Sequence, residues 1–328
     1  MVNLDNQMRH TQSDVFVAYK NEGETPLECL NRLKDEGFLP YNDKFTYAGR
    51  LDPMAEGLMI YLRGEAIKSK HEYLGLSKEY EVEILLGVST DTGDILGLVS
   101  GAILGDVVFD LKNIQSICES FVGDMEVPYP WFSSKTLEGK PLYEWAREFA
   151  DEEGGGLAGE SLEAEGSGDF TLNHKIDRKT VNFAKEGELD GENMEKENVG
   201  MEESMKEEGR EIFLRPMTKL SIQEIVFLDL SLMPIEDLQN NTVRRIAKVK
   251  GDFRQENILS EWNGKVFSNK NKNAKNKKEE TEYPIIKIKV KCASGSYMRT
   301  LAELIGDKLK VPALAYSIKR LGVGDYRV

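Results

Sequence analysis

The segment from Ile286 to Cys292 constrains the fold most strongly, because its apolar and charged residues alternate without a break. Ile286, Ile288, Val290 and Cys292 fall on one face of an extended chain, and three lysines fall on the other. Such a pattern predicts a strand in a sheet that is covered on one side and open to water on the other. For the lysine row we favour a solvated sheet face over a phosphate-binding surface.

The remaining elements expected from the sequence mix strands and helices in irregular order. Apolar periodicity predicts strands over 15–19, 80–86 and 217–232, and helices over 111–121, 142–149, 234–249, 255–262 and 301–309. A further helix begins after Thr25, where Pro26 suits the first position and Glu28 completes a capping box, and it ends near Gly37. This irregular order favours an α+β fold over a regular doubly wound one.

The net charge of −14 is concentrated in one segment. Residues 151–210 hold 18 Asp and Glu against 7 Lys and Arg, a local charge of −11 that leaves −3 for the rest of the chain. With few aromatic or β-branched residues, this segment is expected to be a disordered acidic insertion. A second polar tract over 268–280, rich in Asn and Lys, is expected to be a mobile loop. The nearly neutral remainder is compatible with a basic face for nucleic acid.

The sequence gives little support for a metal-binding, nucleotide-binding or membrane protein. Cys29, Cys118 and Cys292 lie far apart with no zinc spacing, the three histidines are scattered, and no phosphate-loop pattern occurs. No apolar run reaches about 18 residues, and the N-terminus lacks a secretory signal pattern. We therefore expect a cytoplasmic protein without a metal site or a membrane partner.

One carboxylate is held in a loop whose composition restricts the backbone. Asp52 lies between Ala48 and Gly57, in a stretch with two glycines and one proline. Pro53 disfavours helical geometry at Asp52, so the carboxylate is held in an extended segment. It is a candidate nucleophile or general base. By its own pattern, however, an aspartate before proline is more often a turn residue.

Five segments carry a family resemblance. Residues 49–57, Gly-Arg-Leu-Asp-Pro-Met-Ala-Glu-Gly, resemble the Gly-x-Leu-Asp-Pro-x-Ala-x-Gly motif of TruB-type tRNA pseudouridine synthases. Four further segments resemble motifs of that family in the same order: 78–94, 139–147, 215–218 and 292–301. The resemblance covers 15–150 and 211–328. It implies a single catalytic domain over 1–328, with a mixed, mostly antiparallel sheet flanked by helices and loops.

The resemblance also implies an isomerase that converts uridine to pseudouridine in tRNA, at position 55 of the T-loop. Asp52 would attack the uridine, the N1–C1′ bond would break, the base would rotate, and C5 would join C1′, with no metal or organic cofactor. Tyr80 would lie against the flipped-out base and help to remove the C5 proton. Arg299 would pair with Asp52 and keep it ionised. Two alternatives stay open: a tRNA-binding or tRNA-folding protein without turnover, and a synthase acting on another RNA, such as ribosomal RNA.

Five residues are expected to contact RNA, and some of them stand where the chain departs from the family pattern. These residues are Lys20, Tyr47, Arg50, Lys135 and Arg320. Lys20 is followed by asparagine where the family has proline. Tyr47 replaces a common histidine, and Lys135 comes one position early. Arg320 matches a basic end strand.

Two larger departures concern RNA binding. The C-terminal RNA-binding (PUA) domain often found in the family is expected to be absent. An extra helical segment with a Lys- and Asn-rich loop occupies 234–282. We expect its basic residues to supply some of the binding to tRNA. These residues are Arg244, Arg245, Lys248, Lys250 and Arg254. The expected enzyme is a monomer whose partner is tRNA.

Overall fold

The computed structural model describes residues 8–12, 14–103, 110–152, 177–178, 206–207, 210–212, 215–269 and 281–327. The expected acidic insertion over 151–210 and the polar tract over 268–280 lie largely outside these residues, so the predictions for them are not tested here.

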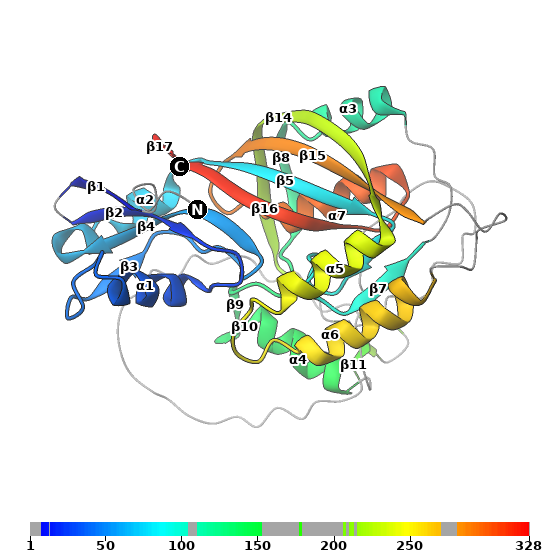
Figure 1. Ribbon diagram of the computed structural model, residues 1–328, viewed down its shortest axis with the longest axis horizontal. Coiled ribbons are helices and arrows are strands. Elements are labelled where there is room, and N and C mark those ends of the chain that lie inside the picture. The colour runs from blue at the N-terminus through cyan, green and yellow to red at the C-terminus, as the bar shows by residue number, and fades with distance from the viewer. Residues whose placement is uncertain are drawn as a thin grey trace.

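A ten-stranded sheet runs through the molecule in the order β1-β2-β4-β16-β5-β15-β14-β8, with β3 beside β4 and β17 beside β16 (Figure 1). Every neighbouring pair is antiparallel except β4 and β16. This confirms the predicted mixed, mostly antiparallel sheet. Its strands are β1 (Met8–Gln12), β2 (Val15–Lys20), β3 (Phe45–Tyr47), β4 (Ala55–Arg63), β5 (Lys78–Leu86), β8 (Gly123–Pro128), β14 (Met217–Pro234), β15 (Glu282–Cys292), β16 (Ala313–Val323) and β17 (Tyr326–Arg327).

Smaller strands pair outside the main sheet. The strands β6 (Val88–Thr90) and β7 (Val99–Ala102) form one hairpin, and β9 (Thr136–Leu137) pairs with β10 (Lys140–Pro141). A third small sheet joins β11 (Asp177–Arg178), β12 (Lys206–Glu207) and β13 (Arg210–Ile212).

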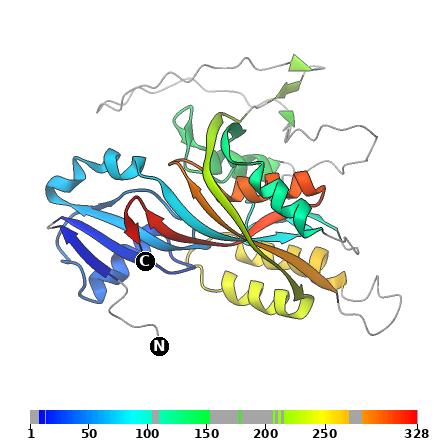
Figure 2. The ribbon, with the colours of Figure 1, turned by 90° about the horizontal axis from the view of Figure 1, so that it is seen from above.

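Helices cover both faces of the sheet, which confirms the predicted α+β class. The helices α3 and α7 lie on one face, and α5 and α6 lie on the other (Figure 2). The helical segments are α1 (Pro26–Asp35), η2 (Gly64–Ile67), α2 (Lys70–Gly75), α3 (Leu111–Glu119), α4 (Leu142–Glu152), α5 (Ile235–Ile246), α6 (Gln255–Glu261), η3 (Trp262–Val266), η4 (Phe267–Asn269) and α7 (Met298–Leu309). The capping box predicted at Thr25 and Glu28 is present in α1.

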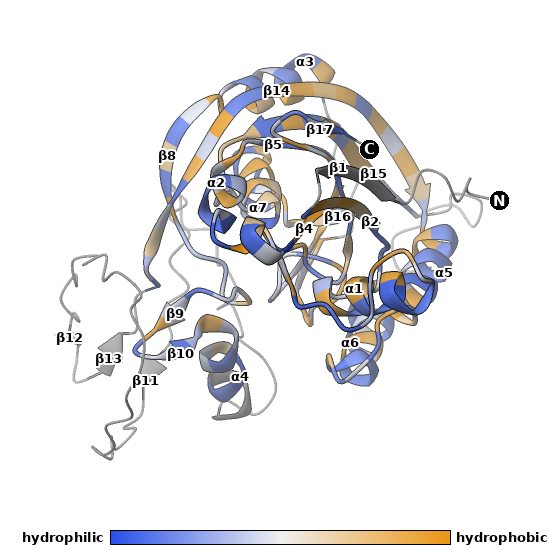
Figure 3. Ribbon diagram, turned by 90° about the vertical axis from the view of Figure 1, so that its left-hand side faces the viewer, coloured by the Kyte–Doolittle hydropathy of each residue, from blue (hydrophilic) through white to orange (hydrophobic). Residues whose placement is uncertain are grey.

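Each helical layer buries its own hydrophobic core against the sheet. Toward α3 and α7, strand residues such as Val82, Ile84 and Ile288 pack with Ile114 and Leu301. The second core, toward α5 and α6, joins the sheet to the extra segment through Leu85, Ile285, Leu314, Tyr316, Leu238, Ile246, Ile258 and Trp262. Both α5 and α6 carry hydrophobic and hydrophilic residues together (Figure 3). The extra segment is therefore packed onto the domain by apolar contacts.

The lysine row of β15 is a solvated, charge-paired face. Lys287 lies 2.8 Å from Glu81, and Lys289 lies 2.6 Å from Glu79, both on the neighbouring strand β5. Opposite charges on adjacent strands interact favourably across a sheet. This confirms the favoured interpretation, because two of the three lysines already have carboxylate partners.

Candidate active site

Asp52 lies in the loop that connects β3 to β4. Its neighbours Leu51 and Met54 are buried, while the Asp52 side chain is 42% exposed. The Asp52 carbonyl accepts a hydrogen bond from the amide of Ala55 at 3.0 Å, where β4 begins. The loop is thus shorter than expected, since residues 55–57 belong to the strand. Apolar anchors on both sides leave one carboxylate facing solvent from a fixed backbone.

Arg299, in the first turn of α7, forms an ion pair with Asp52. Its Nε donates to Oδ2 of Asp52 at 2.8 Å, although 247 positions separate the two residues. The other guanidinium nitrogens donate to the carbonyls of Thr92 at 2.5 Å and Phe132 at 3.0 Å. Arg299 is only 3% exposed. Burial lowers its pKa, but the carboxylates of Asp52, Asp94 and Glu303 outweigh that effect and raise it above its usual value. Arg299 is therefore a permanent cation whose plane is set by two loop carbonyls.

Tyr80 lies on β5, opposite Arg320 of β16 in the strand register. The residue is 8% exposed, and burial raises the pKa of its hydroxyl. Arg320 opposes this shift, and the charge of Asp52 adds to it. Tyr80 is therefore a neutral aromatic side chain that is within electrostatic reach of Asp52.

Sequence reasoning assigned no role to two further acids around Arg299. Asp94 is buried, and its Oδ1 accepts hydrogen bonds from the Thr92 hydroxyl and the Leu96 amide, each at 2.9 Å. Burial raises the pKa of Asp94, and Arg299 opposes the rise. Burial also raises the pKa of Glu303, one turn after Arg299 on α7, to about 7. For Asp94 the only signal in the sequence was its place in the motif over 78–94.

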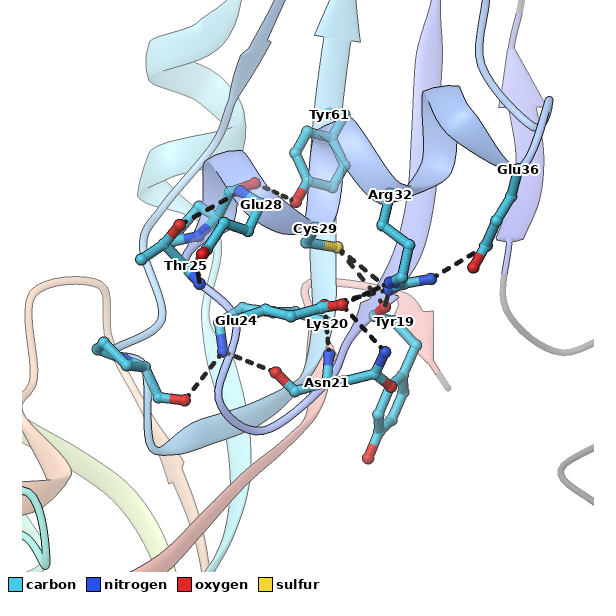
Figure 4. Close-up of polar contacts among 12 residues, drawn as sticks. Tyr19, Lys20, Asn21, Glu24, Thr25, Glu28, Cys29, Arg32, Glu36 and Tyr61 are labelled. Carbon is cyan, nitrogen blue, oxygen red and sulfur yellow. Dashed lines mark hydrogen bonds and ion pairs between the residues drawn. The ribbon is translucent and has the colours of Figure 1, made fainter. Parts of the chain in front are cut away.

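Lys20 is a buried residue that holds the backbone around Asp52. Its ammonium group donates to the carbonyl of Ala55 at 2.5 Å, of Pro53 at 3.4 Å and of Asn21 at 3.1 Å. Figure 4 shows its side chain among the polar groups that connect β2 with α1. Lys20 is 0% exposed, and burial lowers its pKa to about 8. The expectation that Lys20 contacts RNA is corrected, because its buried ammonium group donates to three backbone carbonyls inside the protein.

Arg320 is likewise internal. It is 1% exposed, and its guanidinium donates to the carbonyls of Leu58 at 2.7 Å and Arg50 at 3.2 Å. Its backbone lies against Gly57 of the parallel strand β4. A Cβ at Gly57 would lie 2.2 Å from the Arg320 carbonyl oxygen, and Gly57 has a φ of 118°. The expected phosphate contact of Arg320 is thus corrected as well, since its charge is enclosed between β4 and the Asp52 loop.

The other three predicted RNA contacts lie closer to the surface. Arg50 is exposed, with its guanidinium 6.0 Å from the ring centre of Tyr47. On the same ring, the ammonium of Lys70 lies 5.9 Å from the centre. Lys135 is half-buried, 5.4 Å from the ring centre of Tyr129. For these residues RNA contact stays a prediction.

Three of the five basic residues of the extra segment form ion pairs with acids of the domain. Arg245 and Lys248 lie 2.6 and 2.7 Å from Glu22, and Arg254 lies 2.9 Å from Asp91. Glu22 and Asp91 are both acids of the sheet domain, and Asp91 is almost fully buried. These ion pairs attach the segment to the domain, and the expected RNA contact is corrected for the buried Arg245. For the other four residues RNA contact stays a prediction.

Within the described part of the chain, no group of three or more His, Cys, Asp or Glu residues is arranged to hold a metal ion. Nor does any helix there have the length and apolar character needed to cross a membrane.

Residues 39–153 match the model of the TruB family pseudouridylate synthase N-terminal domain. The chain is 36% identical over 137 residues to tRNA pseudouridine synthase B of Psychrobacter arcticus, covering 41% of this chain and 36% of that protein. It is 34% identical over 147 residues to the Blochmanniella floridana enzyme of the same name, covering 44% and 55%. A third relative with that name, from Burkholderia mallei, is 37% identical over 158 residues, covering 48% and 47%.

The matched segment thus spans only about a third to a half of these relatives' length. Among solved structures, a chain of an H/ACA RNP bound to a substrate RNA gives a TM-score of 0.43 at 13% identity, covering 96% of this chain and 48% of that chain. The matched sequence includes Asp52, Tyr80 and Thr92. Residues 39–153 are therefore similar to the N-terminal domain of TruB family pseudouridylate synthases.

Proposed function

We propose that this chain converts uridine to pseudouridine in tRNA, at position 55 of the T-loop. The observation that carries the proposal is the ion pair between Arg299 Nε and Asp52 Oδ2 at 2.8 Å. A carboxylate that is partly open to solvent beside a buried, permanent cation is a nucleophile held in one orientation. The likeness to three proteins named tRNA pseudouridine synthase B supports the choice of tRNA as substrate.

Each proposed catalytic residue has a distinct task. Asp52 attacks C1′ of the target nucleotide, so the N1–C1′ bond breaks as an Asp52–C1′ bond forms. The base then turns, C5 bonds to C1′ and displaces the Asp52 carboxylate, and the C5 proton is lost while N1 gains one. Tyr80 offers a neutral ring in place of the stacking that a uridine loses when it flips out. Arg299 keeps the Asp52 carboxylate in place and balances its charge. These steps use side chains of the protein alone.

The uridine must be turned out of its loop to reach Asp52. Tyr47, with Arg50 and Lys70 near its ring, lies at the end of β3, just before the Asp52 loop. Aromatic and cationic groups of this kind bind single-stranded bases and phosphates. We therefore place the T-loop contact at this cluster and at Lys135.

The test compares wild-type protein with Asp52→Asn on an unmodified tRNA transcript and on ribosomal RNA. Pseudouridine is mapped along each RNA, and RNA affinity is measured in parallel. The wild type should modify position 55 of the tRNA, and Asp52→Asn should bind tRNA without product. Asp35→Asn, an exposed residue at the end of α1, is the matched control and should act like the wild type.

Each alternative corresponds to a distinct result. Tight tRNA binding by the wild type without pseudouridine in either RNA indicates a binding or folding protein. Product in ribosomal RNA alone assigns another substrate. Equal activity in Asp52→Asn removes Asp52 from catalysis.

A further inference from the structure

The described part of the extra segment, residues 235–269, contacts the domain at two places that lead to the Asp52–Arg299 ion pair. One contact lies at the loop over 90–99, whose Thr92 carbonyl binds Arg299, and it is made mainly by Arg254. The other lies at Glu22 and Gly23, which precede α1.

Arg254 contacts both of the loops that supply the carbonyl acceptors of Arg299. Its Nη1 lies 2.9 Å from Asp91 Oδ2, and its guanidinium carbon is 4.7 Å from the ring centre of Phe132. The residue after Asp91 and Phe132 itself supply the two carbonyl acceptors of Arg299. Arg254 therefore joins the two loops that hold the guanidinium plane of Arg299.

Asp91 needs a cation in this position. Its side chain is 2% exposed, and its Oδ1 accepts a hydrogen bond from the Leu98 amide at 2.8 Å. Burial raises the pKa of Asp91, and the charge and hydrogen bond of Arg254 are the largest effects that oppose the rise. Removing one partner of a buried ion pair leaves an uncompensated charge, and the loop must then move or take up a proton.

Two more residues of the segment fix the same loop. The indole nitrogen of Trp262 donates to the Gly97 carbonyl at 3.3 Å, and the Lys265 ammonium donates to the Val99 carbonyl at 2.9 Å. With Arg254, these bonds attach one continuous helical segment to three points between residues 91 and 99.

The second contact leads to Asp52. Arg245 and Lys248 both pair with Glu22, and the following residue, Gly23, donates its amide to the Pro53 carbonyl at 2.8 Å. Gly23 packs so closely on this segment that a Cβ there would lie 2.6 Å from the Cβ of Lys248. The segment is thus one hydrogen bond away from the residue that follows Asp52.

We infer that the segment over 235–269 is a brace for the active site, and that Arg254 is its principal positioning residue. This inference rests on the proposed function, because it assigns Arg254 the task of setting Arg299 against Asp52. It also gives the basic residues that pair with Glu22 and Asp91 a role within the protein, in place of the expected contacts with tRNA phosphates. A misplacement of about 1 Å in a catalytic pair lowers turnover by up to about 100-fold.

The first experiment separates positioning from RNA contact. Arg254→Gln should lower the single-turnover rate of pseudouridine formation by about 10- to 100-fold, while the Kd for tRNA stays within about twofold of the wild type. Arg254→Lys keeps the charge without the planar fork and should recover part of the rate. The control is Arg327→Gln, which removes a surface arginine near Glu79 and should change neither quantity. A weaker Kd with an unchanged rate in Arg254→Gln would overturn the inference.

Charge compensation gives an independent criterion. Asp91→Asn removes the buried charge that Arg254 balances, so the double variant Arg254→Gln/Asp91→Asn should be faster than Arg254→Gln alone. Residues in contact show such coupling, whereas independent sites have additive effects. Additive losses in the double variant would show that the pair does not position the loop.

Hydrogen exchange distinguishes a failure of the brace from a failure of the proposed function. In Arg254→Gln the amides over 91–99 should exchange faster than in the wild type, whether or not the protein modifies any RNA. A wild-type protein without activity on any RNA, together with this faster exchange, would refute the proposed function and retain the brace. Unchanged exchange would refute the brace itself.

Discussion

Replacing Lys20 with methionine should make the stability of the protein respond differently to pH. Lys20 is fully buried, and burial lowers its pKa from 10.5 to about 8. Its charged form therefore destabilises the folded state, and this cost is fully present below pH 8. The cost declines as pH rises from 8 toward 10.5, because the folded protein releases the proton while the unfolded chain still holds it. Methionine has an unbranched side chain one atom shorter than that of lysine, and it carries no ionisable group.

The size of the effect follows from the shift. The lowering of the Lys20 pKa from 10.5 to about 8 corresponds to about 3 kcal/mol at neutral pH. Of this, the wild type should regain about 2 kcal/mol between pH 7 and pH 9.5, and Lys20→Met should not. The variant also loses the bonds to Ala55 and Asn21, at about 1–3 kcal/mol for each buried acceptor left unpaired. The two effects oppose each other at pH 7, so the variant should appear most destabilised at high pH.

Urea unfolding of both proteins at pH 7, 8 and 9.5 measures this difference. Lys308→Met, at an exposed position of α7, is the control, and its difference from the wild type should not grow with pH. Turnover should also fall in Lys20→Met, because the carbonyls of Pro53 and Ala55, which directly follow Asp52, lose their common donor. The Kd for tRNA should be unchanged.

Two results would refute this reasoning. A stability difference between Lys20→Met and wild type that stays constant from pH 7 to 9.5 would show that Lys20 does not release its proton early. A large loss of tRNA affinity at unchanged turnover would return Lys20 to the role of an RNA contact.

Three further predictions concern the sheet and α7. Gly57→Ala should lower the free energy of unfolding in urea by about 3 kcal/mol, because its Cβ meets backbone at positive φ, whereas Gly75→Ala, with open space around it, should cost less than about 1 kcal/mol. In the unfolded chain the Glu303 carboxyl ionises near pH 4.5, but in the folded protein it holds its proton up to about pH 7. The free energy of unfolding of the wild type should therefore fall as pH rises from 5 to 8. Glu303→Gln has no such proton, so its free energy of unfolding should fall less over this range. Replacing Lys287 and Lys289 with glutamine should leave the salt dependence of tRNA binding unchanged, as measured by filter binding at several salt concentrations, because both lysines already pair with glutamates.

Local patterns in the sequence predicted the local structure well. The cap residue, the proline and the glutamate at the start of α1 act within four positions of one another, so their chemistry determines the helix start directly. The alternation over 286–292 likewise needed only the two-residue repeat of a strand. For the site, motif resemblance chose Asp52 and Arg299, and the structure brings both together across 247 positions.

The surroundings of the site could not be predicted in the same way. A lysine or an arginine has the same appearance in the sequence whether it faces solvent or the interior. Lys20 on β2 and Arg320 on β16 are buried on either side of Gly57 of β4, so their burial depends on pairings between segments that are distant in the sequence. Arg254 gives no local signal either, since its partners, Asp91 and Phe132, lie more than 100 positions earlier in the sequence. Contacts of this kind depend on how the whole sheet is assembled.

The parallel pairing of β4 with β16 has a consequence for the order in which the protein becomes active. The strand that follows Asp52 pairs with residues 318–320. Arg299, the ion-pair partner of Asp52, also lies late in the chain. During synthesis, the first 150 residues are made before Arg299 and residues 318–320. The matched N-terminal part should therefore have no complete site while the rest of the chain is being translated. Because such long-range pairings form slowly, activity should appear as one late event in folding. A nascent chain that stops before β16 should therefore bind no uridine productively, whatever fraction of its helices has already formed.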